Sequence, residues 1–163
     1  MKKFVVRSLS ALAIATSSFS LMAPAVHSQI SVGVSTPIVS NAGTSARGED
    51  HFVEVSVNGD MPLSRLKVVC VTFHKLSGVK VLDADTGAEI PASVDFGFEE
   101  FNITFDTPVA AGTDVRIVME DSRVRGRKDG LTVPYRIFAT YPEIGGEIPI
   151  GTALIRIPEV TSR

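Results

Sequence analysis

HFVEVSV, residues 51–57, sets the fold prediction, because apolar and polar side chains alternate along it. Val53, Val55 and Val57 lie on one face, and polar side chains separate them. A period of two residues is typical of a β-strand with one buried face. The tripeptide Asn-Gly-Asp follows at 58–60, and these residue types favour a turn. The stretch therefore predicts a strand that ends in a turn.

The same alternation recurs in four later runs, which complete the predicted core. Its members are Leu66, Val68, Cys70, Phe101, Ile103, Phe105, Val115, Ile117, Met119, Tyr135, Ile137, Ala139 and Tyr141. Residues 107–113 are expected to turn the chain, 153–157 to form a last strand, and 61–64 to form one helical turn. About seven or eight short strands, separated by Gly, Pro and Asp, predict an all-β fold, an antiparallel β-sandwich.

Residues 1–28 have the composition of a cleaved signal peptide. Cationic residues at the start precede an apolar segment from about 8 to 22, and small residues follow it. Cleavage is expected after Ser28, with the Ala-Pro-Ala step at 23–25 as the alternative. No later segment has the length and apolar character of a transmembrane helix. The sequence thus predicts an exported protein, periplasmic or extracellular, with no transmembrane segment in the mature chain.

The chain beyond this segment has the size of one domain. Residues 29–50 are expected to supply an N-terminal strand, from the alternation at 30–34, and a flexible segment, with the stretch 40–50 loose. Residues 51–160 are expected to form the β-sandwich core domain. All 18 Asp and Glu lie beyond residue 28, so this part is more acidic than the whole chain, whose net charge is −2. Such a balance argues against nucleic acid as a partner.

VLDADTGAEIP, residues 81–91, allows three interpretations. The Asp-Thr-Gly-Ala at 85–88 has the letters of an aspartic-protease motif, which needs two copies to pair its carboxylates. Asp83 and Asp85 are candidate metal ligands, since alternate acids and a Gly form part of a calcium loop. A hairpin connection in which Gly87 takes a positive φ explains every residue, and it is the interpretation we adopt.

A second candidate site is the basic loop within residues 122–130, where Arg123, Arg125, Arg127 and Lys128 could bind an anion. Neighbouring acids offset part of its charge, so a solvated loop is the simpler expectation.

The remaining residues with reactive side chains predict little chemistry. His51 and His74 have no metal-binding spacing and are expected at the surface. Cys70 is the one cysteine, and its place in an alternating run predicts a small buried side chain on a strand. No cofactor is predicted.

Four stretches follow one another between about residues 30 and 160. They are the strand-like HFVEVSV, a strand ending in Val-Thr-Phe, a hairpin with Phe-Asp-x-Pro-Val-x-x-Gly-Thr, and a closing Tyr-Pro and Gly-rich segment. The residues concerned are Leu63, Val71, Thr72, Phe73, Phe105, Asp106, Pro108, Val109, Gly112, Thr113, Val115, Tyr135, Phe138, Tyr141, Pro142, Pro149, Gly151 and Arg156. Their order resembles the cyanobacterial secreted proteins grouped as domain-of-unknown-function 2808. The resemblance implies a bacterial cell envelope setting and assigns no activity. His74, Lys75 and the basic loop depart from the family pattern.

The sequence therefore favours an exported, non-catalytic envelope protein that acts by binding or packing. Its expected partner is an unknown envelope component or protein. Two alternatives stay open. In one, the chain is a structural subunit whose residues 29–50 complete a neighbour's sheet by strand addition. In the other, it is a hydrolase whose site is scattered over loops.

Overall fold

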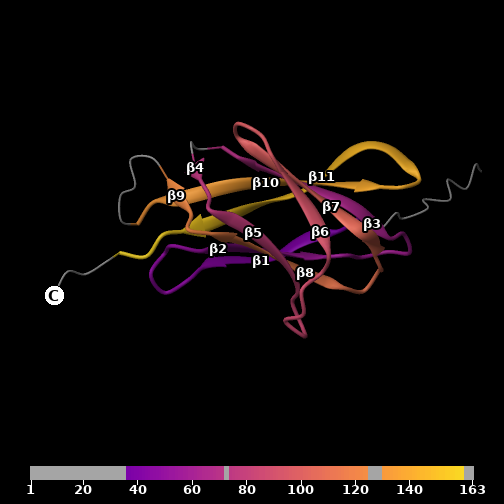
Figure 1. Cartoon of the computed structure of the whole chain (residues 1–163), viewed down its shortest axis with the longest axis horizontal. Helices are drawn as coiled ribbons and strands as arrows, with labels where there is room; N and C mark the ends of the chain where they lie inside the picture. The colour runs from indigo at the N-terminus through magenta and orange to yellow at the C-terminus, as the bar shows by residue number, and fades with distance from the viewer. Residues whose placement is uncertain (1–35, 72–73, 125–129, 160–163) are drawn as a thin grey trace, which may run out of the picture. The chain divides into compact units, whose positions relative to one another are not determined.

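The computed structural model of the chain describes residues 36–71, 74–124 and 130–159, and every regular element among them is a β-strand (Figure 1). The strands are β1 (Ile38–Thr44), β2 (His51–Ser56), β3 (Leu63–Cys70), β4 (His74–Lys75), β5 (Gly78–Asp83), β6 (Ala92–Phe96), β7 (Glu100–Val109), β8 (Asp114–Glu120), β9 (Arg123–Val124), β10 (Thr132–Tyr141) and β11 (Ile144–Arg156). The predicted signal segment 1–28 lies outside the described residues. Across the described part of the chain, no helix is long and apolar enough to cross a membrane.

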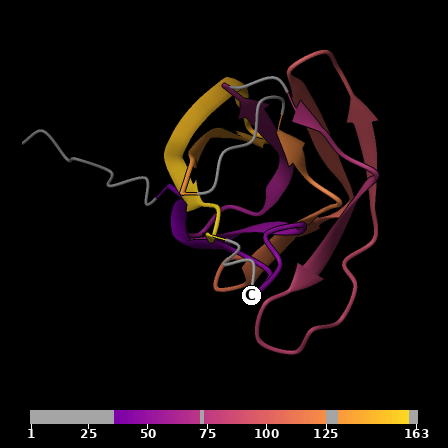
Figure 2. The same ribbon diagram turned by 90° about the vertical axis from the view of Figure 1, so that its left-hand side faces the viewer.

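Two antiparallel sheets form the fold. The four-stranded sheet has the order β1-β2-β8-β5, and the five-stranded sheet has the order β11-β10-β3-β7-β6. In Figure 2 the yellow strand β11 and the pink pair β6–β7 lie at opposite edges of the five-stranded sheet. The short strands β4 and β9 pair with each other and form a separate two-stranded sheet among the described residues. The predicted fold class, an antiparallel β-sandwich, is confirmed, with more strands than the expected seven or eight.

The core lies between the two sheets and is made by the alternating faces that the sequence predicts. The buried side chains include Val53, Val55, Val57, Leu66, Val68, Cys70, Phe101, Ile103, Phe105, Val115, Ile117, Met119, Tyr135, Ile137, Ala139 and Tyr141. They belong to one cluster that takes residues from both sheets. Because successive side chains of a strand point to opposite faces, each strand contributes one apolar row to this core.

The two lateral sides of the sandwich are closed differently. On one side β1 meets β11, and a Cβ added at Gly151 would lie 2.9 Å from Val39 Cγ2. The register of β10 and β11 shifts beside Gly151, so a bulge accompanies this close approach. On the other side, residues 84–91 connect the edge strands β5 and β6, and a bridge joins Leu82 to Glu89.

Two local predictions are wrong. Part of the stretch 40–50, expected to be loose, belongs to β1, which pairs with β2 through contacts such as Gly43 opposite Phe52. The glycine leaves room for the Phe52 ring, whose Cζ would lie 2.7 Å from an added Cβ, and the Arg116 guanidinium lies 5.5 Å from the ring centroid. The expected helical turn near 61–64 is absent, because Leu63 already begins β3. The predicted strand at 30–34 lies outside the described residues.

Candidate functional site

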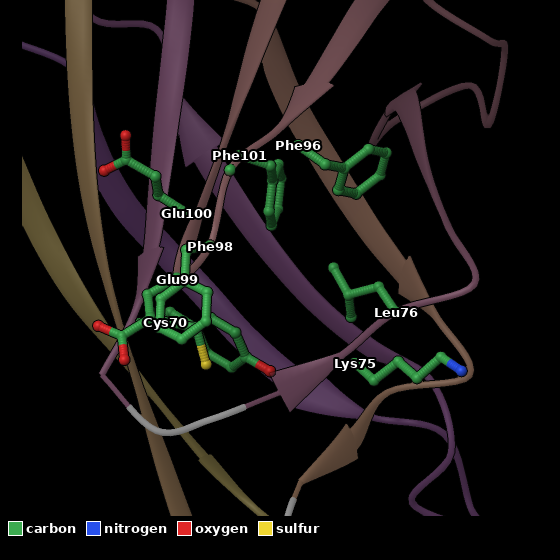
Figure 3. Close-up of a pocket in the computed structure, with 10 residues that line it drawn as sticks. Cys70, Lys75, Leu76, Phe96, Phe98, Glu99, Glu100 and Phe101 are labelled. Atoms are coloured by element: carbon green, nitrogen blue, oxygen red, sulfur yellow. The ribbon is translucent and has the colours of Figure 1, made fainter.

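A cavity of about 240 Å³ opens at the end of β3, beside the connection from β6 to β7. We call it the aromatic pocket. Its lining residues are Cys70, Lys75, Leu76, Phe96, Gly97, Phe98, Glu99, Glu100, Phe101 and Tyr135. Figure 3 shows the side chains of Phe96, Phe101 and Leu76 gathered at one part of the pocket, while the charged ends of Lys75, Glu99 and Glu100 point outward. The pocket thus has an apolar interior and a charged rim.

Two phenylalanines of the rim are unusually exposed. The relative exposed surface is 81% for Phe98 and 54% for Phe96, and Val71, directly after Cys70, reaches 52%. Phe96 also contacts Phe101 with a centroid distance of 6.0 Å. Neighbouring exposed apolar side chains of this size are characteristic of interaction sites rather than of an ordinary surface.

Main-chain hydrogen bonds hold the rim in place. The Gly97 amide donates to the Glu100 carbonyl at 2.8 Å, which closes a tight turn with Phe98 and Glu99 at its tip. The Cys70 amide donates to the Glu99 carbonyl at 2.8 Å and ties this tip to the end of β3. The position of Phe98 is therefore set by the backbone on both sides of the pocket.

The charges of the rim have different environments. Glu100 forms an ion pair with Lys67 at 3.2 Å, and Lys67 also contacts Glu147 at 3.2 Å. Hydrogen bonds to these two carboxylates raise the pKa of the Lys67 ammonium group. Glu99 is exposed and lies outside this ion-pair network. Its carboxylate thus lies exposed at the rim of the pocket.

A buried polar contact lies behind the pocket. Tyr135, opposite Cys70 in the β3–β10 register, forms a hydrogen bond of 2.6 Å with His51 Nδ1. Because His51 belongs to the four-stranded sheet and Tyr135 to the five-stranded one, this bond links the two sheets through the core. Burial raises the pKa of the Tyr135 hydroxyl, and hydrogen bonding to Ser122 offsets only part of that rise. Tyr135 therefore keeps its proton over a wide pH range.

The stretch 81–91 forms the turn that the sequence predicts. Asp83 Oδ1 accepts hydrogen bonds from the amides of Asp85 and Thr86 and from the Thr86 hydroxyl, at 3.1, 2.8 and 2.8 Å. Gly87 takes a φ of 71°. These bonds lower the pKa of the Asp83 carboxyl, with the Thr86 amide as the largest cause. One oxygen of this candidate metal ligand is thus engaged in shaping the turn.

The other predicted site residues are scattered. Arg123 lies in β9, exposed, with its Nε donating to Asp121 Oδ1 at 2.9 Å. Arg125, Arg127 and Lys128 lie outside the described residues. In the portion of the chain with described structure, no three His, Cys, Asp or Glu side chains are grouped to hold a metal ion.

The predicted burial can be compared with the structure for Cys70 and His51. Cys70 is buried on a strand, as predicted. His51 was expected at the surface, and this prediction is wrong, because the imidazole is fully buried against Tyr135. Its position two residues before Val53 places it on the apolar face of β2, so the alternation itself was a sufficient signal. The backbone of His74 belongs to β4.

Sequence reasoning missed the aromatic pocket. The available signal was the group of Phe96, Phe98 and Phe101 around Gly97 and two acids. Such a group is equally consistent with a buried strand, and only the tight turn at Gly97 shows that Phe98 faces outward.

A comparison with models of known protein families finds no match, and a comparison with curated protein sequences finds none either. Solved structures similar to this chain include the N-terminal domain of the Streptococcus gordonii adhesin Sgo0707, with a TM-score of 0.49 and 12% identity over 76% of this chain and 32% of that one. The C-terminal domain of the Streptococcus pyogenes antigen I/II-family protein AspA has a TM-score of 0.42 and 14% identity over 71% of this chain and 42% of that one. The collagen-binding domain from a Staphylococcus aureus adhesin has a TM-score of 0.47 and 10% identity over 74% of this chain and 95% of that one. The chain spans less than half the length of the first two.

Proposed function

We propose that this chain is an exported, non-catalytic protein of the cell envelope that acts by binding, and that the aromatic pocket is its binding site. The observation that carries the proposal is the pair of exposed rings, Phe96 and Phe98, beside a cavity in a protein whose predicted core side chains are buried. An apolar cavity with a few polar groups at its rim is the usual form of a binding site.

The chemistry of the lining defines what can bind. Phe96, Phe98, Phe101 and Leu76 offer apolar surface, and the volume of about 240 Å³ suits a side chain or another small apolar group. Glu99 adds a negative charge at the entrance. A ligand that buries an apolar group and carries a cationic or polar group beside it fits this arrangement.

The location is part of the same proposal. It is supported by the signal-peptide composition of residues 1–28, which predicts release into the periplasm or the extracellular space. The resemblance to the cyanobacterial family of domain-of-unknown-function 2808 supports an envelope setting. The partner we propose is a protein or another component of that envelope.

A photo-crosslinking residue at position 98 tests this proposal in the native host. The matched control carries the same residue at position 154, because Leu154 is another large apolar side chain, 65% exposed and outside the pocket lining. We expect a discrete crosslinked species from position 98 that is absent from position 154. Identical patterns from the two positions, or none from position 98, would contradict a binding role for the pocket.

A further inference from the structure

Strand β6 is the last strand of the five-stranded sheet, next to β7. In an antiparallel pair, residues whose backbone groups bond across the pair alternate with residues whose backbone groups point away. The Gly97 amide donates to Glu100, and the Asp106 amide donates to Pro91, so both of these pairs are of the bonded kind.

These two anchors fix the alternation along β6. Bonded pairs recur at every second residue of an antiparallel strand. Between Pro91 and Gly97, the backbone groups of Ser93 and Asp95 are therefore also bonded to β7, opposite Thr104 and Asn102. The amides and carbonyls of Ala92, Val94 and Phe96 then point to the free edge of the sheet. No β-bulge interrupts β6 between Ala92 and Phe96, a range that the structure describes in full.

The side chains of β6 divide between two faces. Ala92, Val94 and Phe96 lie opposite Phe105, Ile103 and Phe101, which are core residues. Ala92 and Val94 are half-buried against that core, and the row ends at Phe96 on the aromatic pocket. Ser93 and Asp95 occupy the outer face and are exposed. The edge thus combines open backbone groups, an apolar row that leads into a cavity, and an acid on the other face.

We propose that the edge of β6 accepts an extended polypeptide segment of a partner protein as an additional strand. Main-chain groups of that segment would pair with those of Ala92, Val94 and Phe96. Only a polypeptide supplies hydrogen-bond donors and acceptors at the two-residue spacing of these groups. Its alternate side chains would be apolar on the core face, one of them entering the aromatic pocket. A Lys or Arg on its outer face would meet Asp95.

This inference rests on the proposed function of the pocket and names its partner class. Long, flat edge strands are commonly blocked by lysines, prolines or bulges. Within β6 the one charged side chain is Asp95, which favours a cationic partner rather than excluding all strands.

The test uses the mature chain and an acetylated and amidated peptide of about seven residues, alternating Val and Lys, which is long enough to cover the five residues of β6. Amide hydrogen exchange is followed by NMR with and without the peptide. In the free protein we expect fast exchange at Ala92, Val94 and Phe96 and slow exchange at Ser93 and Asp95. The peptide should protect the first three amides.

Two N-methylated peptides serve as matched controls. One carries the methyl groups on the alternate amides that would face β6, and the other carries them on the amides that would face away from β6. Methylation of the set that faces β6 should abolish binding, and methylation of the other set should leave it intact. Equal binding of both methylated peptides would overturn strand addition, as would unprotected amides in β6 at millimolar peptide. Protection of the same amides by the protein alone at rising concentration would show that a second copy occupies the edge, and would also overturn the proposal.

Variants separate this inference from the proposed function. Asp95→Lys should weaken peptide binding by about two- to fivefold, the range for an exposed ion pair. Phe96→Ser should weaken it by about tenfold or more, as for an apolar anchor. If crosslinking from position 98 succeeds while the β6 amides stay unprotected, the pocket binds a ligand by another mode and strand addition alone fails.

Discussion

Cys70 is buried, with 7% of its surface exposed, yet it lines the aromatic pocket. We expect a bulky maleimide to label the folded protein much more slowly than the urea-unfolded protein, because the reagent is too large to reach the thiol. A small reagent such as methyl methanethiosulfonate should enter the pocket and react faster than the maleimide in the folded state. Mass spectrometry of timed samples measures both rates. Equal maleimide rates in folded and unfolded protein would contradict the buried position.

Asp83 makes its contribution as a carboxylate, since three donors converge on Oδ1 and lower its pKa. A depressed pKa in the folded state means that this stabilisation is present above the unfolded pKa and is lost as pH falls through the folded one. Asp83→Asn should therefore lower the free energy of unfolding at neutral pH, and the difference from wild type should shrink below about pH 4. Urea titrations at several pH values measure it.

Two further changes control for the same turn. Asp85→Asn should have little effect, because no hydrogen bond to the Asp85 carboxylate is found within the described residues. Gly87→Val should cost about 1–3 kcal/mol through backbone strain, because the φ of 71° disfavours a β-branched residue while nothing lies within 4 Å of the new Cβ. Calcium should leave the melting temperature unchanged. A calcium-dependent rise that Asp83→Asn removes would restore the metal interpretation.

At the scale of elements, the contact between β1 and β11 depends on one missing Cβ. Gly151→Ala should cost about 1–3 kcal/mol, because the new methyl group would meet Val39 at 2.9 Å. Gly145 and Gly146 lie in the same strand, and nothing lies within 4 Å of a Cβ added at either. Gly146 shares a positive φ with Gly151, 117° and 156°, and Gly145 does not. Gly145→Ala should change stability by less than about 0.5 kcal/mol, and Gly146→Ala isolates the cost of backbone strain. Comparable losses in all three would contradict the packing role of Gly151.

Elements also show what the sequence could and could not predict. Strands such as β2 and β8 alternate without interruption, because one face packs on the core, and their predicted faces are confirmed. β1 was missed, because its sequence IVSNAGT does not alternate and Gly43 stands where Phe52 needs space. The aromatic pocket was missed for a different reason. It is formed by β3, β4, β6, β7 and β10, and a single sequence does not show which strand ends meet.

At the scale of the whole molecule, the hydrogen bond between His51 and Tyr135 links the two sheets. Tyr135→Phe should lower the free energy of unfolding by about 1–3 kcal/mol, because it removes a partner from a buried imidazole. The double variant with His51→Phe should lose less than the two single variants together, since two apolar rings leave no polar group unsatisfied. Urea unfolding of the four proteins measures the coupling. Additive losses would show that the bond does not stabilise the sandwich.

The burial of Tyr135 predicts an alkaline limit to stability. Burial raises the pKa of Tyr135 above its ordinary value of 10.0, so the unfolded chain releases this proton first. The contribution of the protonated Tyr135 to folding stability is complete below that ordinary pKa and is lost as pH rises above it. The free energy of unfolding should fall above about pH 10, and less steeply in Tyr135→Phe. Tyr141→Phe is a useful comparison, since burial also raises the pKa of Tyr141.

The tip of the β6–β7 turn has an evolutionary consequence. Phe98 and Glu99 are held by main-chain hydrogen bonds from Gly97 and Cys70, and neither takes a positive φ. Because main-chain groups close the turn, we expect related chains to exchange these two residues while the sandwich stays intact. Recognition can then diverge faster than architecture. Homologues adapted to different partners should vary most at positions 98 and 99 and least at the glycine and cysteine positions that anchor them.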